Sequence, residues 1–382
     1  MSEIATQNNI LYCKFGTSGI GLCNQLYSLV NTMVTGSVLK GNKTLVIVDD
    51  FMGDLNSSQY HDCSTILDLK RMNTFLYTYR YEVSLISKHA VQIESIKIEY
   101  GQRDIKTVDV TNIMMELFYT RNRLCIPNGT SLNQVSGCDP CPCVRKKLYI
   151  TYTINGFTFK ETRDEIIHED VCVIDFMNWH TKPWMSLTGI NDCKDRIDTF
   201  NCFLNNVYFN EIYETHANLF ISDKCNGKDK DKDKKKINVI HLRLEEDAIP
   251  FWSSINGISC EAYETELVRQ YIENIREHID PADSINVILS MNTCNPVTKW
   301  MTENKYEFVQ MNKTLVQGRE VNAIIDLLIS LKCNNVFIGN LNPHNYHGST
   351  FSYAIFNALR NTTVKKICID NDDIYHPAYI CL

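Results

Sequence analysis

The 382-residue sequence has no stretch of about 20 apolar residues, the length that a helix needs to cross a membrane. Its first residues, MSEIATQNN, are polar, so they lack the basic flank and the apolar run of a signal peptide. Basic residues are not in excess, since 38 Lys and Arg stand against 45 Asp and Glu. We therefore expect a soluble, unexported, cytoplasmic protein with no membrane span that does not bind nucleic acid.

The sequence also lacks the second half of a zinc-binding motif. Cys138, Cys141 and Cys143 stand close together in GCDPCPCV, and their Cys-x-x-Cys spacing can begin a zinc site or a disulfide. No second Cys-x-x-Cys and no pair of histidines follows to complete four ligands. The other interpretation is a proline-containing loop with reduced thiols, and we favour it because most of the 16 cysteines lie in apolar segments. We expect no metal site.

Strand and helix patterns alternate at both ends of the chain. Near the N-terminus the apolar ILYCKF precedes a glycine-rich turn, then helical spacing over 24–39, then the β-branched strand TLVIVDD at 44–50. Beyond the middle, strands are expected at 237–244, 284–291 and 335–340, with helices at 260–279 and 321–333. Each end therefore has the strand–helix–strand pattern typical of a parallel sheet.

The middle of the chain has a mixed periodicity, and within it only YEVSLISKHAVQIESIKIEY suggests strands. The run CNGKDKDKDKKK at 225–236 is almost without apolar residues, and its Asp residues offset its Lys residues, which predicts a solvated loop. We expect an N-terminal domain over 1–222, a linker over 223–236 and a second α/β domain over 237–382. A ligand cleft would then lie outside the carboxyl ends of the strands.

The glycine-rich stretch GTSGIGLCNQL begins at Gly16 and allows two interpretations from its residues alone. Its order, G-x-x-G-x-G, differs from the dinucleotide pattern G-x-G-x-x-G, although Asp49 and Asp50 follow where a ribose-binding acid would lie. An NAD-dependent oxidoreductase is therefore one alternative. The other is a tight strand-to-helix turn that needs glycine only for backbone freedom.

The segment HLRLEED at 241–247 combines polar and apolar side chains in alternation. On a strand, His241, Arg243 and Glu245 would lie on one face and the two leucines on the other. A polar triplet at the end of a buried strand is costly in a plain core, which indicates a functional role. A structural ion pair of Arg243 with Glu245 or Asp247 is the alternative.

The stretch NYHGSTFSYAIFNAL at 345–359 runs from a loop into an apolar helix, with Ser349 or Thr350 as the N-cap. Free backbone N–H groups, the positive helix end and neighbouring hydroxyls make an anion site, and phosphate is the obvious ligand. The alternative is an ordinary capped helix whose hydroxyls satisfy only its own backbone.

These segments together resemble the protein O-fucosyltransferase superfamily, which includes plant relatives that contain rhamnosyltransferases. HLRLEED is similar to its HLRxExD segment, GIGLCNQL to its N-terminal G-x-x-N-Q loop, and REVNAIIDLLISLKCNNVFIGN with GSTFS to its E-x-x-x-x-D…D-x-F-I-G-N…S-S-F block. The matching residues are 16–30, 237–250 and 319–353. The chain departs from the pattern where Leu22 and Cys23 precede Asn24 without the usual Arg, and in an insertion at 341–346.

The resemblance implies an α/β fold of the GT-B type, with two Rossmann-like domains whose parallel sheets face each other across a cleft. It implies an inverting, metal-independent glycosyltransferase that moves a deoxyhexose, with fucose from GDP-fucose favoured, to a glycan or protein hydroxyl. Rhamnose from a UDP or related donor is the alternative among enzymes. A non-catalytic protein that binds nucleotide sugars or glycans is the alternative outside them. No cofactor is expected besides the donor.

The resemblance also assigns roles to single residues. Arg243 would neutralise the departing β-phosphate, Asp326 would hydrogen-bond the base, and Asn24 would reach the sugar and phosphate. The expected donor-binding residues are Gly19, Gly21, Asn24, His241, Arg243, Asp326, Ser349, Thr350 and Phe351. The expected catalytic residues are Arg243, Glu245 and Asn24.

The chemistry of glycosyl transfer agrees with these roles. A departing nucleoside diphosphate gains negative charge, which a fixed guanidinium and a helix N-terminus stabilise, so a metal is dispensable. The metal-binding pattern Asp-x-Asp occurs as Asp370-Asn-Asp372, in a polar tail that we interpret as a solvated turn. Glu245, Glu246 and Asp247 are all candidates for the base that deprotonates the acceptor.

Overall fold

The chain forms two compact units, each made of several segments. The computed structural model describes residues 8–15, 21–39, 43–54, 59–120, 123–165, 171–172, 194–225, 236–246, 248–292, 294–311, 318–342 and 347–369. The first unit consists of Met1–Lys14, Thr32–Asp50 and Leu69–Thr181, and the second of Phe15–Asn31, Phe51–Asp68 and Lys182–Leu382. Most of the expected linker at 223–236 lies outside the described residues, so the linker stays a prediction. None of the described helices is long and apolar enough to cross a membrane.

A parallel sheet forms one part of the first unit. Its strands lie in the order β1 (Asn9–Cys13), β2 (Thr44–Val48) and β5 (Val83–Ser87), and both pairings are parallel. Helix α1 (Leu22–Val38) connects β1 to β2, and α3 (Leu69–Thr78) precedes β5. Every side chain of β2 is buried, as expected for a central strand of β-branched and apolar residues. The predicted strand–helix–strand unit is confirmed.

An antiparallel sheet forms the other part of the first unit, in the region where the sequence pattern is mixed. Its strands lie in the order β11 (Phe157–Asp164), β10 (Lys147–Ile154), β6 (Ile93–Gln102) and β7 (Lys106–Asp109). The turn between β10 and β11 consists of Asn155 and Gly156, both with positive φ, as two-residue hairpins favour. Smaller elements are η1 (Lys88–Ala90), α4 (Thr111–Phe118), β8 (Tyr119–Thr120), β9 (Arg123–Ile126), α5 (Leu132–Val135) and β12 (Val171–Cys172).

The second unit contains a five-stranded sheet in which all pairings are parallel. Its order is β15 (Phe308–Val309), β14 (Ser284–Leu289), β13 (Lys236–His241), β16 (Val336–Gly339) and β19 (Lys365–Cys368). The connecting helices are α8 (Ala248–Asn256), α9 (Cys260–His278), α10 (Pro296–Glu303), α11 (Arg319–Ser330) and α12 (Thr350–Ala358). The α/β class, with a parallel sheet in each half of the chain, is therefore confirmed.

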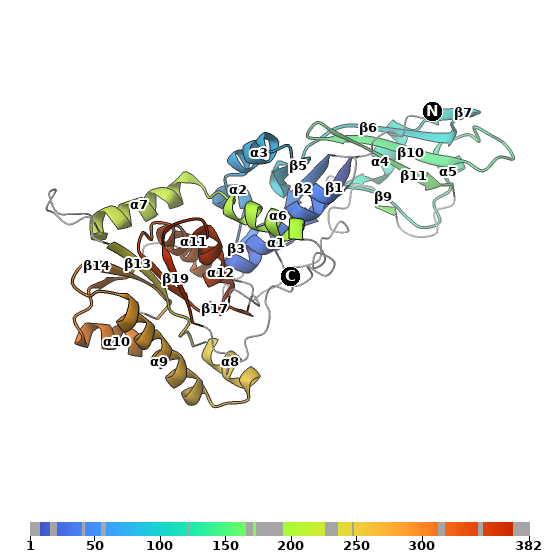
Figure 1. Ribbon diagram of the computed structural model, residues 1–382. Helices are drawn as coiled ribbons and strands as arrows, with labels where there is room; N and C mark the ends of the chain where they lie inside the picture. Colours follow the sequence, from blue (N-terminus) through green and yellow to red (C-terminus); the bar gives the residue numbers. More distant parts are fainter. Residues whose placement is uncertain are drawn as a thin grey trace. The chain divides into compact units, whose positions relative to one another are not determined.

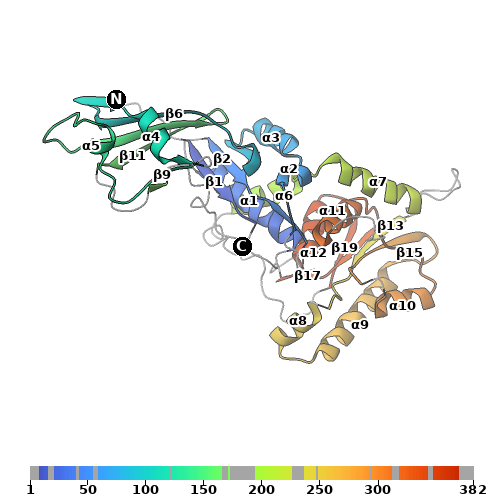
Figure 2. The ribbon, with the colours of Figure 1, turned by 180° about the vertical axis from the view of Figure 1, so that it is seen from behind.

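Helices cover both faces of this sheet. Ile240, Ile288 and Ile338 pack in one apolar cluster with side chains of α9 and α10. Because side chains alternate along a strand, His241 lies on the other face, the one that α12 covers. Figures 1 and 2 show α9 and α10 on one side of the sheet and α11 and α12 on the other.

Segments from the first 68 residues complete the second unit. The beginning of α1 belongs to it, and so does the hairpin of β3 (Phe51–Asp54) and β4 (Gln59–His61). Strand β3 packs beside α11, which on another side meets α7. The remaining elements are α2 (Cys63–Ile66), α6 (Lys194–Asn205), α7 (Glu211–Cys225), β17 (Leu341–Asn342) and β18 (His347–Gly348).

Candidate functional site

His241 is the last residue of β13, which ends earlier than the predicted strand end at residue 244. Its side chain is 6% exposed, and its Nδ1 lies 2.6 Å from Oγ of Ser352 in α12. Its ring also packs against Phe351, with 4.9 Å between the ring centroids. The end of β13 is therefore fixed to the first turn of α12.

Tyr271 of α9 holds the backbone that follows β13. Its hydroxyl donates to the carbonyl of His241 at 2.8 Å and accepts from the backbone N–H of Arg243 at 3.2 Å. Burial is the largest cause that raises the pKa of Tyr271 far above its ordinary value, so the hydroxyl stays a donor. Leu242 and Leu244 are buried in the apolar cluster, and this confirms that the leucines and the polar residues point to different sides.

Arg243 and Glu245 form an ion pair, with 2.7 Å between Nη1 and Oε2. Their side chains are 26% and 9% exposed, respectively. The ion pair that was the alternative for this segment is thus present, and it leaves the guanidinium partly accessible. Because its carboxylate is bound to Arg243, Glu245 is suited to orient the guanidinium. Of the other two acids in HLRLEED, Glu246 is exposed and Asp247 lies outside the described residues.

Ser349 is the N-cap of α12, as predicted. Its Oγ accepts from the backbone N–H of Ser352 at 3.4 Å, and its own N–H donates to the carbonyl of Asn340 at 2.8 Å. Thr350 and Phe351, the next two residues, are half-buried. The carbonyl of Thr350 accepts a hydrogen bond from the hydroxyl of Tyr27 at 2.6 Å.

Asn340, which follows β16, joins this group although the sequence analysis does not select it. Its backbone N–H donates to Oγ of Ser352 at 3.0 Å, and the residue is only 2% exposed. Its Nδ2 has no hydrogen-bond partner among the described residues. The preceding Gly339 lies so close to α12 that a Cβ there would be 3.0 Å from Oγ of Ser352. A polar residue at the end of a buried parallel strand was the available signal.

The glycine turn ends at Gly21, whose carbonyl accepts from the N–H groups of Asn24 and Gln25 at 3.1 and 3.2 Å. Gly19 lies outside the described residues. Oδ1 of Asn24 is buried and has no hydrogen-bond partner among the described residues. The backbone N–H of Leu22, the first residue of α1, donates to Oε2 of Glu320. A carboxylate of the protein itself therefore accepts a hydrogen bond from the first N–H group of α1.

Asp326 is 6% exposed on α11, the helix that also carries Glu320. Most of the expected site residues that the structure describes lie in two places. One is the end of β13, the segment after it and the start of α12, and the other is the helices α1 and α11. His241, Phe351, Ser352, Ser349 and Asn340 are linked by direct contacts. Recognition of a base by Asp326 stays a prediction.

Asp49 and Asp50, the acids of the dinucleotide alternative, are paired within the first unit. Nζ of Lys88 lies 2.8 Å from Asp49 and 2.6 Å from Asp50, and Nε2 of His89 lies 2.6 Å from Asp50. Burial lowers the pKa of Lys88, but the hydrogen bonds and charges of the two aspartates outweigh it and the pKa is raised. These carboxylates are therefore engaged where that alternative needs them to accept ribose hydroxyls.

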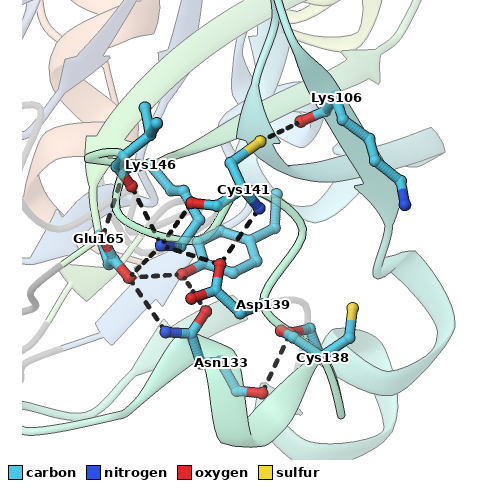
Figure 3. A network of polar contacts seen from close by, with 10 residues as sticks. Lys106, Asn133, Cys138, Asp139, Cys141, Lys146 and Glu165 are labelled. Atoms are coloured by element: carbon cyan, nitrogen blue, oxygen red, sulfur yellow. Dashed lines mark hydrogen bonds and ion pairs between the residues drawn. The ribbon is translucent and has the colours of Figure 1, made fainter.

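The cysteine-rich loop shows a different arrangement from a zinc site. The thiol of Cys141 is buried and donates to the carbonyl of Lys106 at 3.2 Å, while Cys138 and Cys143 are exposed. Figure 3 shows the sulfur atom of Cys141 facing the carbonyl oxygen of Lys106, with the sulfur atom of Cys138 apart from it. Among the residues that the structure describes, no group of three or more His, Cys, Asp or Glu side chains is arranged to hold a metal ion.

A buried lysine fixes this loop instead. The side chain of Lys146 is 4% exposed, and its Nζ lies 3.1 Å from both Asp139 Oδ1 and Glu165 Oε1 (Figure 3). Glu165 also accepts from the hydroxyl of Tyr100 at 2.9 Å. Burial raises the pKa of Glu165, but its hydrogen bonds to Lys146 and Tyr100 outweigh burial and lower the pKa. This network of ion pairs and hydrogen bonds stabilises the conformation of the loop.

Comparisons with known proteins show that this chain is similar to several solved structures. No protein-family model and no curated protein matches the chain. POFUT1 in complex with GDP matches with a TM-score of 0.49 and 8% identity, covering 96% of this chain and 99% of that one. For POFUT1 with GDP-fucose the TM-score is 0.47, with 8% identity over 96% and 98% of the two chains. The fucosyltransferase NodZ from Bradyrhizobium matches with a TM-score of 0.43 and 11% identity, over 91% of each chain. The solved structures to which this chain is similar over most of its length therefore include fucosyltransferases.

Proposed function

We propose that the chain is an inverting, metal-independent glycosyltransferase that moves a deoxyhexose to a hydroxyl of a glycan or protein. Fucose from GDP-fucose is the favoured donor. The observation that carries the proposal is that Arg243 and the N-terminus of α12 follow β13 and β16, two strands paired in one parallel sheet. Segments that follow neighbouring parallel strands emerge at the same sheet edge, where α/β proteins bind their ligands.

The charge at this edge suits a leaving diphosphate. Arg243 carries a permanent positive charge. Glu245 orients its guanidinium, and the side chain of Arg243 stays 26% exposed. The N-terminus of α12 adds the partial positive charge of a helix end and its N–H groups. The contact between His241 and Ser352 fixes the helix end to the strand end at 2.6 Å, so the positive groups are preorganised.

The reaction forms one bond to the anomeric carbon of the sugar and breaks another. The acceptor oxygen attacks the anomeric carbon of the sugar while the bond from that carbon to the phosphate oxygen breaks. The bonding electrons leave with the diphosphate, and the positive groups stabilise the charge that this creates. The acceptor proton passes to a base, and attack from the side opposite the leaving group inverts the anomeric centre.

Nucleotide binding tests the donor half of the proposal. A ligand at 100 times its Kd stabilises a protein by about 2.7 kcal/mol, which a melting curve resolves. We expect GDP to raise the melting temperature and UDP and NAD not to do so. Protection by UDP alone would favour a rhamnosyl donor, and protection by NAD alone would favour the oxidoreductase. Protection by GDP without turnover of any nucleotide sugar would indicate a binding protein.

A further inference from the structure

Glu320 is a buried carboxylate that the proposed reaction does not use. It is 3% exposed in the first turn of α11, and its Oε2 accepts a hydrogen bond from the backbone N–H of Leu22. The two residues are 298 positions apart in the sequence, and both belong to the second unit. A Cβ added at Gly21 would lie 3.7 Å from the same oxygen, so the backbone at Gly21 passes close to the carboxylate.

The position of Glu320 explains why a charge is tolerated there. A buried carboxylate is costly unless hydrogen bonds and positive charge compensate it. The first N–H groups of a helix lack partners within the helix, and they carry partial positive charge. Glu320 stands in the first turn of α11, whose N-cap, Gly318, provides no side-chain hydrogen bond, and it binds the first residue of α1. The carboxylate therefore reaches from the first turn of α11 to the N-terminus of α1, and Nε of Arg319 lies 3.8 Å from its other oxygen, Oε1.

The first turns of α1 have a second attachment. The hydroxyl of Tyr27 donates to the carbonyl of Thr350 at the start of α12, and its ring packs against Tyr353 with 6.3 Å between centroids. The start of α1 is thus bound to α11 through Leu22 and to α12 through Tyr27. Between these two attachments lies Asn24, whose buried Oδ1 has no hydrogen-bond partner among the described residues.

We propose that Glu320 is a positioning residue that holds Gly21 and the first turn of α1, and thereby places Asn24 for the sugar–phosphate part of the donor. This inference rests on the proposed function for the identity of the donor. Without the carboxylate, the N–H of Leu22 loses its acceptor, and the start of α1 keeps only its attachment through Tyr27. A residue that acts through Asn24 has no further effect once Asn24 is removed.

The test has a structural arm that needs no activity. Amide hydrogen exchange at Leu22 is compared in the wild type, Glu320→Ala, Glu320→Gln and the control Glu303→Gln, an exposed glutamate on α10. We expect exchange at Leu22 to accelerate by about tenfold or more in Glu320→Ala, because a lost local hydrogen bond lowers the cost of opening. Glu320→Gln keeps an acceptor, so it should accelerate exchange less. Unchanged exchange in both Glu320 variants would overturn the inference.

The kinetic arm is a double-mutant cycle on nucleotide-sugar turnover. Glu320→Ala and Asn24→Ala should each lower kcat/KM by about tenfold to 10²-fold, as small misplacements at a reacting centre do. The double variant should lose no more than the larger single loss. Losses that multiply, or a Glu320→Ala enzyme with wild-type kcat/KM, would overturn the inference. If the wild type turns over no nucleotide sugar, the proposed function fails, and the exchange arm alone decides whether Glu320 holds the turn.

Discussion

Nδ1 of His241 and Oγ of Ser352 lie 2.6 Å apart, although 111 residues separate them in the sequence. The same oxygen accepts the backbone N–H of Asn340 at 3.0 Å. One hydroxyl therefore joins the ends of two neighbouring strands to α12. We therefore expect the geometry of the proposed donor site to depend on this hydroxyl.

Replacing Ser352 tests this dependence. In Ser352→Ala the backbone N–H of Asn340 loses its acceptor and the imidazole of His241 loses its hydroxyl partner. An unsatisfied buried polar group costs about 1–3 kcal/mol, so the free energy of unfolding should fall by about that amount. Urea unfolding measures this change, with the exposed Ser254 of α8 replaced in the control Ser254→Ala. A Ser352→Ala protein as stable as the control would show that the hydrogen bonds of this hydroxyl do not stabilise the fold.

Arg243 is the residue on which the proposed chemistry most depends. If its charge acts on the departing diphosphate, Arg243→Ala should lower kcat by about 10²- to 10³-fold, the loss typical of one preorganised electrostatic group. Arg243→Lys keeps the charge but loses the planar fork, so it should recover only part of kcat. Single-turnover kinetics beside melting curves measure both effects, with Arg360→Ala on the surface as the control.

A purely structural Arg243 would behave differently. Removing one partner of a buried ion pair costs about 3–5 kcal/mol, and here the 26% exposure of Arg243 reduces that cost. A folded Arg243→Ala protein with wild-type kcat would contradict the catalytic role. A large loss of stability without a loss of kcat per folded molecule would assign Arg243 to the fold.

The lysine network of the first unit predicts a pH dependence of stability. The pKa of Glu165 lies below its ordinary value near 4.5, because its hydrogen bonds to Lys146 and Tyr100 outweigh burial. A carboxylate whose pKa is lower in the folded state stabilises the protein above about pH 4.5. This contribution is lost as the pH falls through the folded pKa.

Lys146→Met should reduce that pH dependence and destabilise the protein at pH 7, since it leaves Glu165 and Asp139 without their buried cation. The measurement is urea unfolding between pH 7 and pH 3, with exposed Lys147→Met as the control. We expect a flatter curve for Lys146→Met than for the control. Parallel curves for the two variants would show that the pKa of Glu165 does not depend on Lys146.

Metal independence is a separate prediction. The positive charge at the proposed site comes from Arg243 and the N-terminus of α12, so turnover should persist in excess EDTA. The assay compares initial rates with and without the chelator, followed by addition of Mn²⁺ or Mg²⁺. Loss of turnover in EDTA that either ion restores would show that a metal neutralises the diphosphate.

Local rules allowed part of the fold and the site to be predicted from the sequence. The Ser349 cap and the span of α1 follow from residues within one or two turns, where capping and apolar spacing act. The polar and apolar sides of HLRLEED follow from strand alternation, although β13 ends at His241 and the segment continues as irregular backbone that Tyr271 holds. Strands β5 and β6 lie largely in the segment YEVSLISKHAVQIESIKIEY that suggested strands. The antiparallel sheet that β6 forms with β7, β10 and β11 was not predicted, because its strands mix buried and half-buried positions without a clean period of two.

The contacts that complete the site depend on residues far apart in the chain. No local pattern relates Glu320 to Leu22, because the bond exists only once α1 and α11 pack in one unit. The same holds for Asn340, whose importance comes from the distant Ser352 and His241 rather than from its neighbours in the sequence. Sequence patterns therefore predicted the elements and several site residues, and tertiary contacts determine which of these residues meet.

The proposed glycosyltransferase function depends most directly on turnover of a nucleotide sugar. The decisive measurement incubates the purified chain with a panel of donors, including GDP-fucose, UDP-rhamnose and UDP-glucose, and quantifies the nucleoside diphosphate released. We predict release from GDP-fucose in EDTA, with a rate that Arg243→Ala lowers by about 10²-fold or more. No release from any donor, or release that Arg243→Ala leaves unchanged, would contradict the proposed function.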